Sequence, residues 1–488
     1  MLPTVIPTLA AGSDHRLPAP ESRGNLRKFA LPVWPFGGTL RLDRISGRLL
    51  GRPTAIMRIL FLHPNFPAQF RHVAAALGRD PENQVVFGTK NENPEWQIAG
   101  VQKVLFKPSR DPAPGTHHYI RPFEAAVLQG QSMFRVAEAL KSNGFVPDVV
   151  YGHSGWGSTL FMKDAFPDTK LLGYFEWFYK SKGADADFDP AEPLSVDDQA
   201  RIRIKNASIL QDLYTCDRGI CPTAWQRSQF PAEYQSKLHV LHDGVDTDFF
   251  VPEPNAKLVL PNLDLSHVDE IVTYVGRGME PYRGFPEFME SLVYLQEKRP
   301  NCHVVIVGSD RVCYGRALPD GKTYKQLMLE RLPLDLSRIH FVGSLPYGLY
   351  LKVLQASKAH IYLTRPFVLS WSMIESMSAG CLVVGSATAP VQEVIRDGEN
   401  GLLADFFSPK QIADRVSEVL DHPTQMAHIR QAARNTVLER YSHQALLWRH
   451  VQFLKDFAAD RLPPIQYPPA STLVDYYNEP SREPATVV

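Results

Sequence analysis

Cysteine is scarce in this chain. There are five cysteines, an odd number at scattered positions, and they offer neither a disulfide framework nor a repeated metal-ligand spacing. This scarcity favours a reducing compartment. Cys216 and Cys221 sit around an apolar run that we expect to form a strand, and there we interpret them as buried structural thiols.

Long hydrophobic runs and an excess of charge of one sign are also missing. No apolar run approaches the roughly 20 residues needed to cross a bilayer. The opening MLPTVIPTLAAGSDHR lacks the basic start and unbroken apolar stretch of a secretory signal. Lysine plus arginine equals aspartate plus glutamate, at 52 each, which argues against nucleic acid as a partner. We therefore expect a cytoplasmic protein; peripheral attachment to the inner face of the cytoplasmic membrane is the alternative.

The 488 residues suggest two or three domains. Residues 1–56 are rich in proline and arginine without a sustained period, which indicates a disordered extension or a start placed too far upstream, with Met57 the better start. The remaining segments predict a first domain (57–252), a linker (253–270), a second domain (271–442), a crossover helix (443–460) and a flexible tail (461–488).

Both domains alternate apolar runs with helix-like stretches. This β-α-β alternation predicts the α/β class, with doubly wound parallel sheets that face one cleft. The stretch 121–144 has helical spacing and ends on Asn-Gly, a helix stop signal. The expected strands are 58–63, 84–88, 148–153, 170–175, 218–222 and 238–242 in the first domain, then 271–276, 302–308, 338–343, 359–364, 381–386 and 401–406.

Two arginines stand where a strand passes into a helix. In YVGRGMEPYRGFPEFMESL, Arg277 follows the strand and Arg283 comes six residues later. Two guanidiniums beside a helix N-terminus predict a diphosphate clamp, because each offers a planar fork of donors. Surface arginines at loop ends are the equally weighted alternative.

A carboxylate lies in the next candidate helix, SWSMIESMSAG. Glu375 in its early turns is able to accept two hydroxyl hydrogen bonds from a ribose, as an acidic residue does in dinucleotide folds. A solvated helix face is the alternative interpretation. The apolar neighbours Met373, Ile374 and Met377 favour a partly buried and functional position.

Two D-x-D spacings resemble those of metal-dependent transferases. They are DAD at 185–187 and DTD at 246–248. Because arginines and helix ends supply the positive charge in the expected site, no divalent ion is implied. We interpret both as loop aspartates and expect neither a metal nor another cofactor.

Taken as a set, Arg277, Arg283, Glu375 and the ending EVIRDGENGLL make residues 57–460 similar to retaining glycosyltransferases of family 4, which share the GT-B fold. In that family an arginine and a basic residue, matching Arg277 and Arg283, bind the donor diphosphate. The final glutamate of E-x7-E, matching Glu375, holds the ribose. The resemblance implies a same-face reaction in which the leaving phosphate helps to deprotonate the acceptor.

The resemblance extends to the first domain. His153, at the end of DVVYGH, matches a family histidine near the donor sugar, and LHDGVDTDFF resembles an NGVD strand-end motif. HPNFPAQF corresponds to a glycine-rich turn but carries Pro67 and Ala68 instead of paired glycines, so the Gln69 side chain is the expected substitute there. Backbone near Val342 and Gly343 is expected to contact the base.

The departure lies in RPFVLSWSMIESMSAG. Phe367 stands where the family has the first glutamate of E-x7-E, which accepts hydrogen bonds from sugar hydroxyls, and Val368, Leu369 and Ser370 replace the usual GFG. Phenylalanine cannot accept such bonds. Because Arg277, Arg283 and Glu375 are all present, we expect an active enzyme in which Glu176 or Ser370 takes over the hydroxyls, or whose donor lacks one.

These features together predict transfer of a hexose from a nucleotide diphosphate sugar to a carbohydrate or lipid-linked acceptor, in bacterial surface polysaccharide assembly. A noncatalytic GT-B subunit that binds nucleotide sugar is the alternative from another class. A GT-B epimerase is a further alternative, whereas a phosphorylase would need a pyridoxal-phosphate lysine motif that we do not find.

Overall fold

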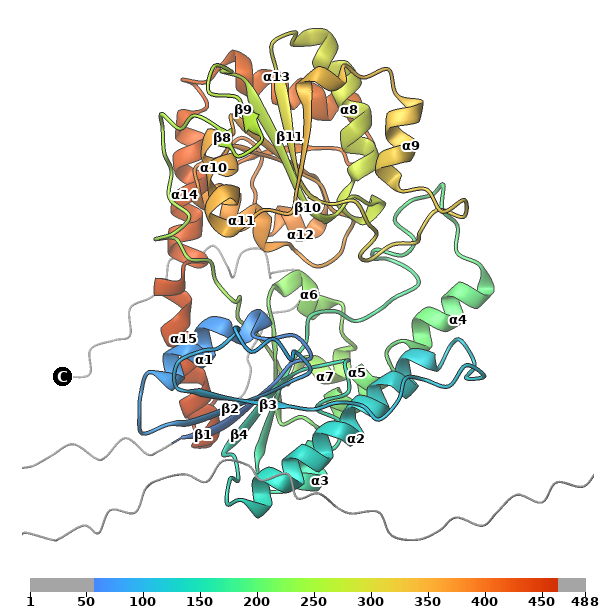
Figure 1. Cartoon of the computed structure of the whole chain (residues 1–488), viewed down its shortest axis with the longest axis vertical. Helices are drawn as coiled ribbons and strands as arrows, with labels where there is room; N and C mark the ends of the chain where they lie inside the picture. Colours follow the sequence, from blue (N-terminus) through green and yellow to red (C-terminus); the bar gives the residue numbers. More distant parts are fainter. Residues whose placement is uncertain (1–56, 464–488) are drawn as a thin grey trace, which may run out of the picture. The chain divides into compact units, whose positions relative to one another are not determined.

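The structure, a computed structural model, describes residues 57–463. The predicted disordered extension (1–56) and most of the predicted tail (464–488) lie outside these residues. Two parallel β-sheets dominate the described chain, each with its own helices (Figure 1).

The first sheet has seven strands in the order β3-β2-β1-β4-β5-β6-β7, all paired in parallel. Its strands are β1 Arg58–Leu62, β2 Gln84–Thr89, β3 Val101–Leu105, β4 Val149–His153, β5 Lys170–Tyr174, β6 Arg218–Cys221 and β7 Leu238–Val240. Its helical elements are η1 Ala68–Phe70, α1 Arg71–Gly78, α2 Arg121–Ser142, α3 Met162–Ala165, α4 Val196–Ile204, α5 Ala207–Thr215, α6 Ala224–Ser228 and α7 Ala232–Gln235.

The second sheet has six strands in the order β12-β11-β10-β13-β14-β15, again parallel. Its strands are β10 Ile271–Gly278, β11 His303–Ser309, β12 Ile339–Gly343, β13 Ala359–Tyr362, β14 Val383–Ser386 and β15 Leu402–Ala404. The helical elements here are η2 Pro281–Arg283, α8 Phe285–Lys298, α9 Tyr324–Arg331, η3 Leu336–Arg338, α10 Tyr347–Ala356, α11 Trp371–Ser378, α12 Ala389–Gln392, α13 Pro409–Asp421 and α14 Ala427–Arg440.

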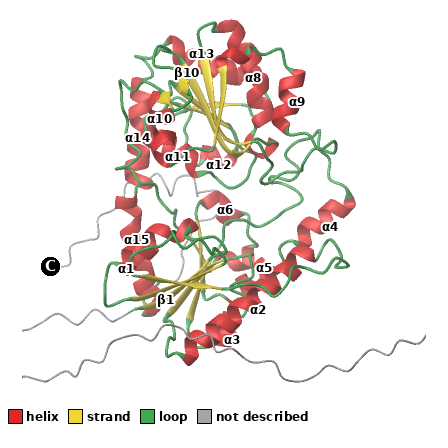
Figure 2. Cartoon of the chain, in the orientation of Figure 1, coloured by secondary structure: helices red, strands yellow, loops and turns green. Residues whose placement is uncertain are grey.

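Side chains from the strands of the second sheet pack into two core layers. Val305 and Val307 point into one layer, with residues of α10, α11 and α14, whereas Val304 and Ile306 point into the other, with residues of α8, α9 and α13. Figure 2 shows these two groups of helices on opposite sides of the strands. The doubly wound α/β fold expected from the apolar runs is therefore confirmed.

The segment expected to be a plain linker is more ordered than its composition indicated. It contains a short antiparallel hairpin, β8 Val259–Leu260 and β9 Leu263–Asp264. Leu258 and Leu265 are buried in the core of the second domain. Two prolines and the polar residues between the leucines hid this anchoring from periodicity arguments.

The predicted crossover helix packs on the first domain. Helix α15 (His443–Ala458) buries Leu454 and Phe457 in the core layer that contains Ile59 of β1. Before it, Val245 at the end of the first domain exchanges backbone hydrogen bonds with Tyr441 and His443, at 2.7 and 3.0 Å. The chain thus ends its second domain and returns to the first.

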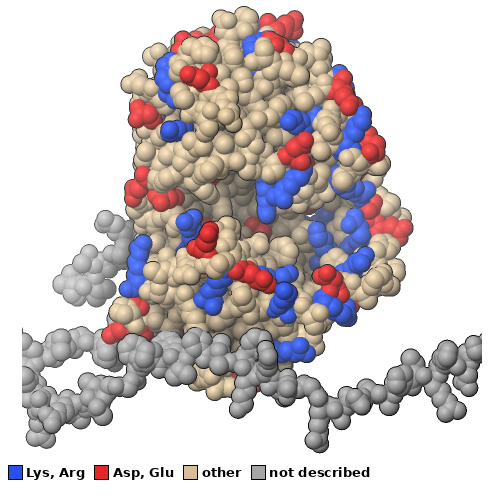
Figure 3. Space-filling model, viewed as in Figure 1, with Lys and Arg blue, Asp and Glu red and all other residues tan. Residues whose placement is uncertain are grey.

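All five cysteines are free, and all but Cys313 are buried. Cys216 and Cys221 are therefore buried in the core of the first domain, as expected. Within residues 57–463, no helix combines the length and apolar character needed to span a bilayer. Acidic and basic side chains lie interspersed over the surface in Figure 3.

Candidate functional site

Arg277 emerges from an irregularity at the end of β10. The pairing of β10 with β11 jumps from Val275 opposite Val307 to Gly278 opposite Ser309, so two residues of β10 face one of β11. Such a bulge redirects a side chain and is common beside active sites. Arg277, the last but one residue of β10, is accordingly exposed near the carboxyl end of the strand.

Arg283 is buried and fixed in place. Its Nη1 donates to Thr364 Oγ1 at 2.8 Å, to the Val368 carbonyl at 2.9 Å and to the Tyr362 hydroxyl at 3.2 Å. All these partners are neutral, so its charge is not cancelled by them. Gly284 follows with φ of 59°, and a Cβ there would lie 2.5 Å from Leu363 Cβ, so glycine is needed to begin α8 this close to the next strand.

Glu375 lies inside the second domain rather than on a solvated face. It is 7% exposed, in α11, and its Oε2 accepts a 2.9 Å hydrogen bond from the Tyr350 hydroxyl. Burial raises the pKa of Glu375 to about 7, although the bonds from Tyr350 and Tyr347 lower it. Ser370 caps this helix by accepting from the Ser372 N–H.

Phe367 belongs to a cluster of aromatic side chains. It is 7% exposed, and its ring centroid lies 4.9 Å from that of Trp177, 5.2 Å from that of Tyr282 and 5.2 Å from that of Tyr314. Its neighbour Val368 also packs against this cluster, and Leu369 is buried in the main core. The position of the missing carboxylate is therefore filled by a packed ring.

Three residues of the first domain that were expected at the donor lie together. Glu176 Oε1 accepts from Gln69 Nε2 at 3.3 Å, and Glu176 Oε2 is 3.5 Å from His153 Nε2. Burial raises the pKa of Glu176, but His153, Gln69 and the charge of Arg283 outweigh it, and the net shift is downward. The charge of Arg283, in the second domain, thus contributes to the lowered pKa of Glu176.

The turn before Gln69 adopts the conformation that glycine favours without having a glycine. Ala68 has φ of 47°, in the left-handed region. His63, which sequence reasoning missed, packs its ring against that of His153 with centroids 4.9 Å apart. Burial, followed by the charge of His153, lowers the pKa of His63 well below its usual range.

The expected base-contacting backbone lies at the end of β12. Val342 and Gly343 are half-buried there, and Gly343 has φ of 69°. A Cβ on Gly343 would meet no atom within 4 Å, so the backbone at this position is open.

Sequence reasoning also missed Asp243, in the strand-end motif LHDGVD. It accepts from the Tyr174 hydroxyl at 2.9 Å and from Trp371 Nε1, in α11, at 3.1 Å. Burial, with a contribution from Glu176, raises the pKa of Asp243 to about 7. A second set of hydrogen bonds also joins the two domains. The Glu393 carboxylate accepts from the backbone N–H groups of Ala224 and Trp225 at 2.9 and 2.7 Å.

The two D-x-D stretches make structural contacts. Asp185 accepts from the Tyr282 hydroxyl at 2.7 Å, and Asp187 from the Gly183 N–H at 2.9 Å. Asp246 accepts from the N–H groups of Asp248 and Phe249. Across residues 57–463, no group of three or more His, Cys, Asp or Glu side chains is arranged to hold a metal.

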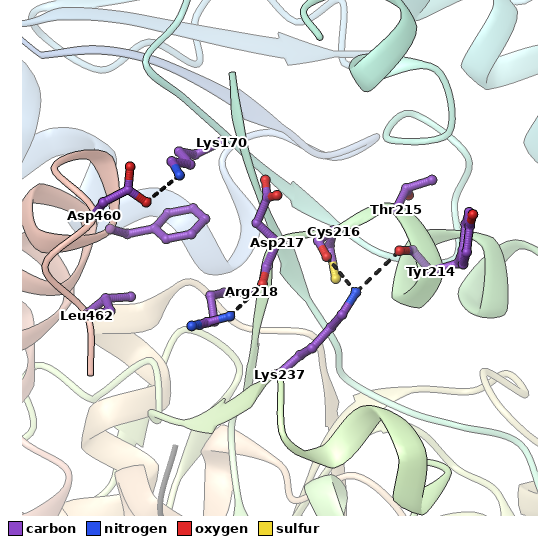
Figure 4. Close-up of a pocket in the computed structure, with 10 residues that line it drawn as sticks. Lys170, Tyr214, Thr215, Cys216, Asp217, Arg218, Lys237, Asp460 and Leu462 are labelled. Carbon is purple, nitrogen blue, oxygen red and sulfur yellow. Dashed lines mark hydrogen bonds and ion pairs between the residues drawn. The ribbon is translucent and has the colours of Figure 1, made fainter. Parts of the chain in front are cut away.

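A cavity of about 450 Å³ lies elsewhere, where β5, β6 and β7 begin (Figure 4). Its lysines are already engaged. Lys170 is paired with Asp460, and Lys237 Nζ donates to the carbonyls of Leu213 and Cys216 at 2.9 and 2.8 Å. Ligands of open α/β sheets bind at the carboxyl ends of strands, so this cavity is not the candidate site.

Two segments of the chain match models of known protein families. Residues 81–250 match the model of the glycosyl transferase family 4 group, and residues 261–436 match that of glycosyl transferases group 1. Two consecutive segments of the chain are thus similar to glycosyltransferase families. The second match includes Arg277, Arg283 and Glu375. The first includes His153 and Glu176, whereas Gln69 lies outside it.

Curated relatives match over part of their length. The D-inositol 3-phosphate glycosyltransferase of Corynebacterium glutamicum (strain R) is 24% identical over 192 residues, which cover 38% of this chain and 44% of that protein. The protein of the same name from Mycolicibacterium smegmatis is 28% identical over 232 residues, covering 46% and 50%. The chain thus spans half or less of the length of these curated relatives.

Solved structures share the fold. Sucrose-phosphate synthase from Thermosynechococcus elongatus has a TM-score of 0.61 at 18% identity, covering 83% of this chain and all of that one. Anabaena Alr3699/HepE in complex with UDP-glucose has a TM-score of 0.60 at 16% identity, covering 82% and 100%.

Proposed function

We propose that this protein is a hexosyltransferase that moves a sugar from a nucleotide diphosphate sugar to a carbohydrate or lipid-linked acceptor with retention of configuration. Bacterial surface polysaccharide assembly in the cytoplasm is the proposed setting. The observation that carries the proposal is the pairing of an exposed Arg277 with a buried, fixed Arg283 at the carboxyl end of the second sheet.

The chemistry of glycosyl transfer explains why that pair matters. Breaking the anomeric bond places negative charge on the departing diphosphate, and preorganised positive groups stabilise it. Arg283 is held by three neutral oxygen acceptors before any ligand arrives, so its orientation requires no reorganisation. Arg277 is exposed, so a diphosphate can reach it from solvent.

The nucleoside and sugar subsites follow from the same edge. Glu375 in α11 is proposed to accept ribose hydroxyls, and the open backbone at Val342 and Gly343 to face the base. Glu176, with Gln69 and His153, is proposed to hold the sugar hydroxyls that Phe367 cannot. The Anabaena protein of the same fold is described in complex with UDP and with UDP-glucose, which makes uridine sugars the first donors to test.

One observation favours a second candidate. Phe367 fills the position of an expected sugar-binding carboxylate and packs on Trp177. A noncatalytic nucleotide-sugar-binding subunit would tolerate that change. The presence of the arginine pair and Glu375 argues against it, because decay of an unused site would not be expected to spare these three residues selectively.

The test combines binding and turnover. Wild type, Arg277→Ala and the matched surface variant Arg331→Ala, which removes an arginine from the exposed face of α9, are titrated with nucleoside diphosphates. The proteins are then assayed for transfer and hydrolysis with UDP-, GDP- and ADP-hexoses. Binding and turnover that fall only in Arg277→Ala support the transferase. Tight binding without turnover on any donor supports the noncatalytic candidate, and absence of binding overturns both.

A further inference from the structure

The loop between β11 and α9 is anchored by a buried carboxylate. Glu280 has no exposed surface, and its oxygens accept backbone N–H groups of three successive residues: Cys313 at 2.9 Å, Tyr314 at 2.9 and 3.1 Å, and Gly315 at 2.7 Å. Successive backbone amides that converge on one anion form a nest. Because a buried charge must be compensated, the loop and Glu280 hold each other in place.

This anchoring places Tyr314 beside the arginine pair. The Arg283 Cζ lies 5.4 Å from the centre of the Tyr314 ring. Although burial lowers the pKa of both Arg277 and Arg283, the nearby Tyr314 contributes to a net rise in each. The ring also contacts Phe367, with centroids 5.2 Å apart. Tyr314 remains 37% exposed, so it faces the open side of this group.

The hydrogen-bonding capacity of these groups determines where the phenol proton points. A guanidinium offers five donors and no acceptor, so the Tyr314 hydroxyl can accept from an arginine but cannot donate to one. The O–H of Tyr314 then has no acceptor on either arginine and is directed away from them. A diphosphate held by Arg277 and Arg283 presents acceptor oxygens at that place.

We propose that Tyr314 is a further donor-binding residue, whose hydroxyl donates to the leaving diphosphate alongside Arg277 and Arg283, and that Glu280 positions it. This inference rests on the proposed function. It adds a neutral donor to the clamp, supplied by a loop that bears none of the predicted site residues.

Removing the single oxygen tests the role of Tyr314. Tyr314→Phe keeps the ring contact with Phe367 and deletes the hydroxyl. The matched control is Tyr324→Phe, which deletes a hydroxyl that donates to the Arg316 carbonyl at 3.0 Å in the same region. Both variants and wild type are titrated with UDP, GDP and ADP and with the corresponding monophosphates.

For the diphosphate that wild type binds most tightly, Tyr314→Phe is expected to raise Kd about tenfold or more, as for the loss of a hydrogen bond to a charged group. The monophosphate Kd should change less than about threefold, and Tyr324→Phe should match wild type. An unchanged diphosphate Kd in Tyr314→Phe overturns this inference alone. If wild type binds no nucleoside diphosphate, the proposed function falls with it.

A double-variant cycle tests the positioning role of Glu280. Glu280→Gln should weaken diphosphate binding in the wild-type background and have less than about a threefold effect in the Tyr314→Phe background, because it acts through the same hydroxyl. A full effect in both backgrounds overturns the positioning role. If Glu280→Gln does not fold, Glu280→Asp takes its place in the cycle, and Tyr314→Phe still decides the binding role.

Discussion

The ring of Phe367 meets that of Trp177 edge to face, with centroids 4.9 Å apart and planes inclined by 68°. Edge-to-face pairs add to the stability gained from burial. Trp177 directly follows Glu176, so the segment that packs on Phe367 also carries a first-domain carboxylate whose pKa is lowered by His153 and Gln69 and, to a smaller extent, by the charge of Arg283, against the effect of burial. Under the proposed function, the sugar-binding carboxylate has moved to the other domain.

Phe367→Ala should destabilise the protein by about 3 kcal/mol, because it removes a buried ring and leaves a cavity among Trp177, Tyr282 and Tyr314. Urea denaturation measures the change. The control Phe407→Ala truncates a ring that is 42% exposed, and it should cost less than half as much. Equal effects would show that Phe367 does not pack as described.

Arg277→Ala and Arg283→Ala should separate binding from stability. Each should weaken nucleoside diphosphate binding by roughly ten- to a hundredfold, since a hydrogen bond to a charged group contributes about 1.5 to 3 kcal/mol. Only Arg283→Ala should also lower Tm, because it removes the guanidinium that donates to Thr364, Tyr362 and the Val368 carbonyl inside the fold. Calorimetry and thermal melts provide both readings; unchanged binding in Arg277→Ala would remove that residue from the site.

Sequence patterns predicted the buried strands well because parallel strands covered on both faces are continuous apolar runs. They missed β3, whose residues Val101–Leu105 alternate between half-buried and exposed at the sheet edge. The arginine pair and Glu375 could be proposed from the sequence for a local reason: each belongs to one short motif, with Arg277 near the end of β10, Arg283 just before α8 and Glu375 within α11.

Contacts between residues far apart in the sequence could not be predicted from local patterns. Glu280 contacts residues 33 to 35 positions away, and Asp243 contacts Trp371 across 128 positions. Nothing in the local pattern of either carboxylate identifies its partner. The replacement of glutamate by Phe367 was visible in the sequence, but the Trp177 ring that completes its environment comes from the other domain.

Glu375 should make stability depend on pH. Its pKa rises from 4.5 to about 7 on folding, so the folded state holds a proton that the unfolded state has released. The stabilisation from this group is complete below about pH 4.5 and is lost as pH rises to about 7, an effect on the order of 3 kcal/mol.

Urea denaturation at pH 5 and pH 8 of wild type and Glu375→Gln measures this effect. The glutamine variant should become more stable relative to wild type at the higher pH, because its side chain does not ionise. Glu399→Gln, which alters an exposed carboxylate, should follow wild type at both values. Parallel behaviour of wild type and Glu375→Gln would contradict the raised pKa.

Glu176→Gln should impair recognition of the sugar while sparing the nucleotide. Gln69 and His153 hold the Glu176 carboxylate from one side, and its side chain stays 35% exposed. If that face accepts sugar hydroxyls, the variant should lose about ten- to a hundredfold in kcat/KM with the preferred donor. Its Kd for the free nucleoside diphosphate should stay within about threefold of wild type, as should both constants in the control Glu233→Gln, on the exposed face of α7.

Donor pairs that differ by one hydroxyl give the sharper reading. A site that pairs with a hydroxyl discriminates strongly against its absence, whereas an apolar wall does not. Wild type should therefore prefer the hydroxylated donor, and Glu176→Gln should reduce that preference. Adding Phe367→Glu to Glu176→Gln returns a carboxylate to the second domain, at a position where the Phe367 ring centre now lies 6.0 Å from Arg283 Cζ, and should restore part of the preference. Equal loss of nucleotide and sugar recognition in Glu176→Gln would instead assign Glu176 to the general structure of the site.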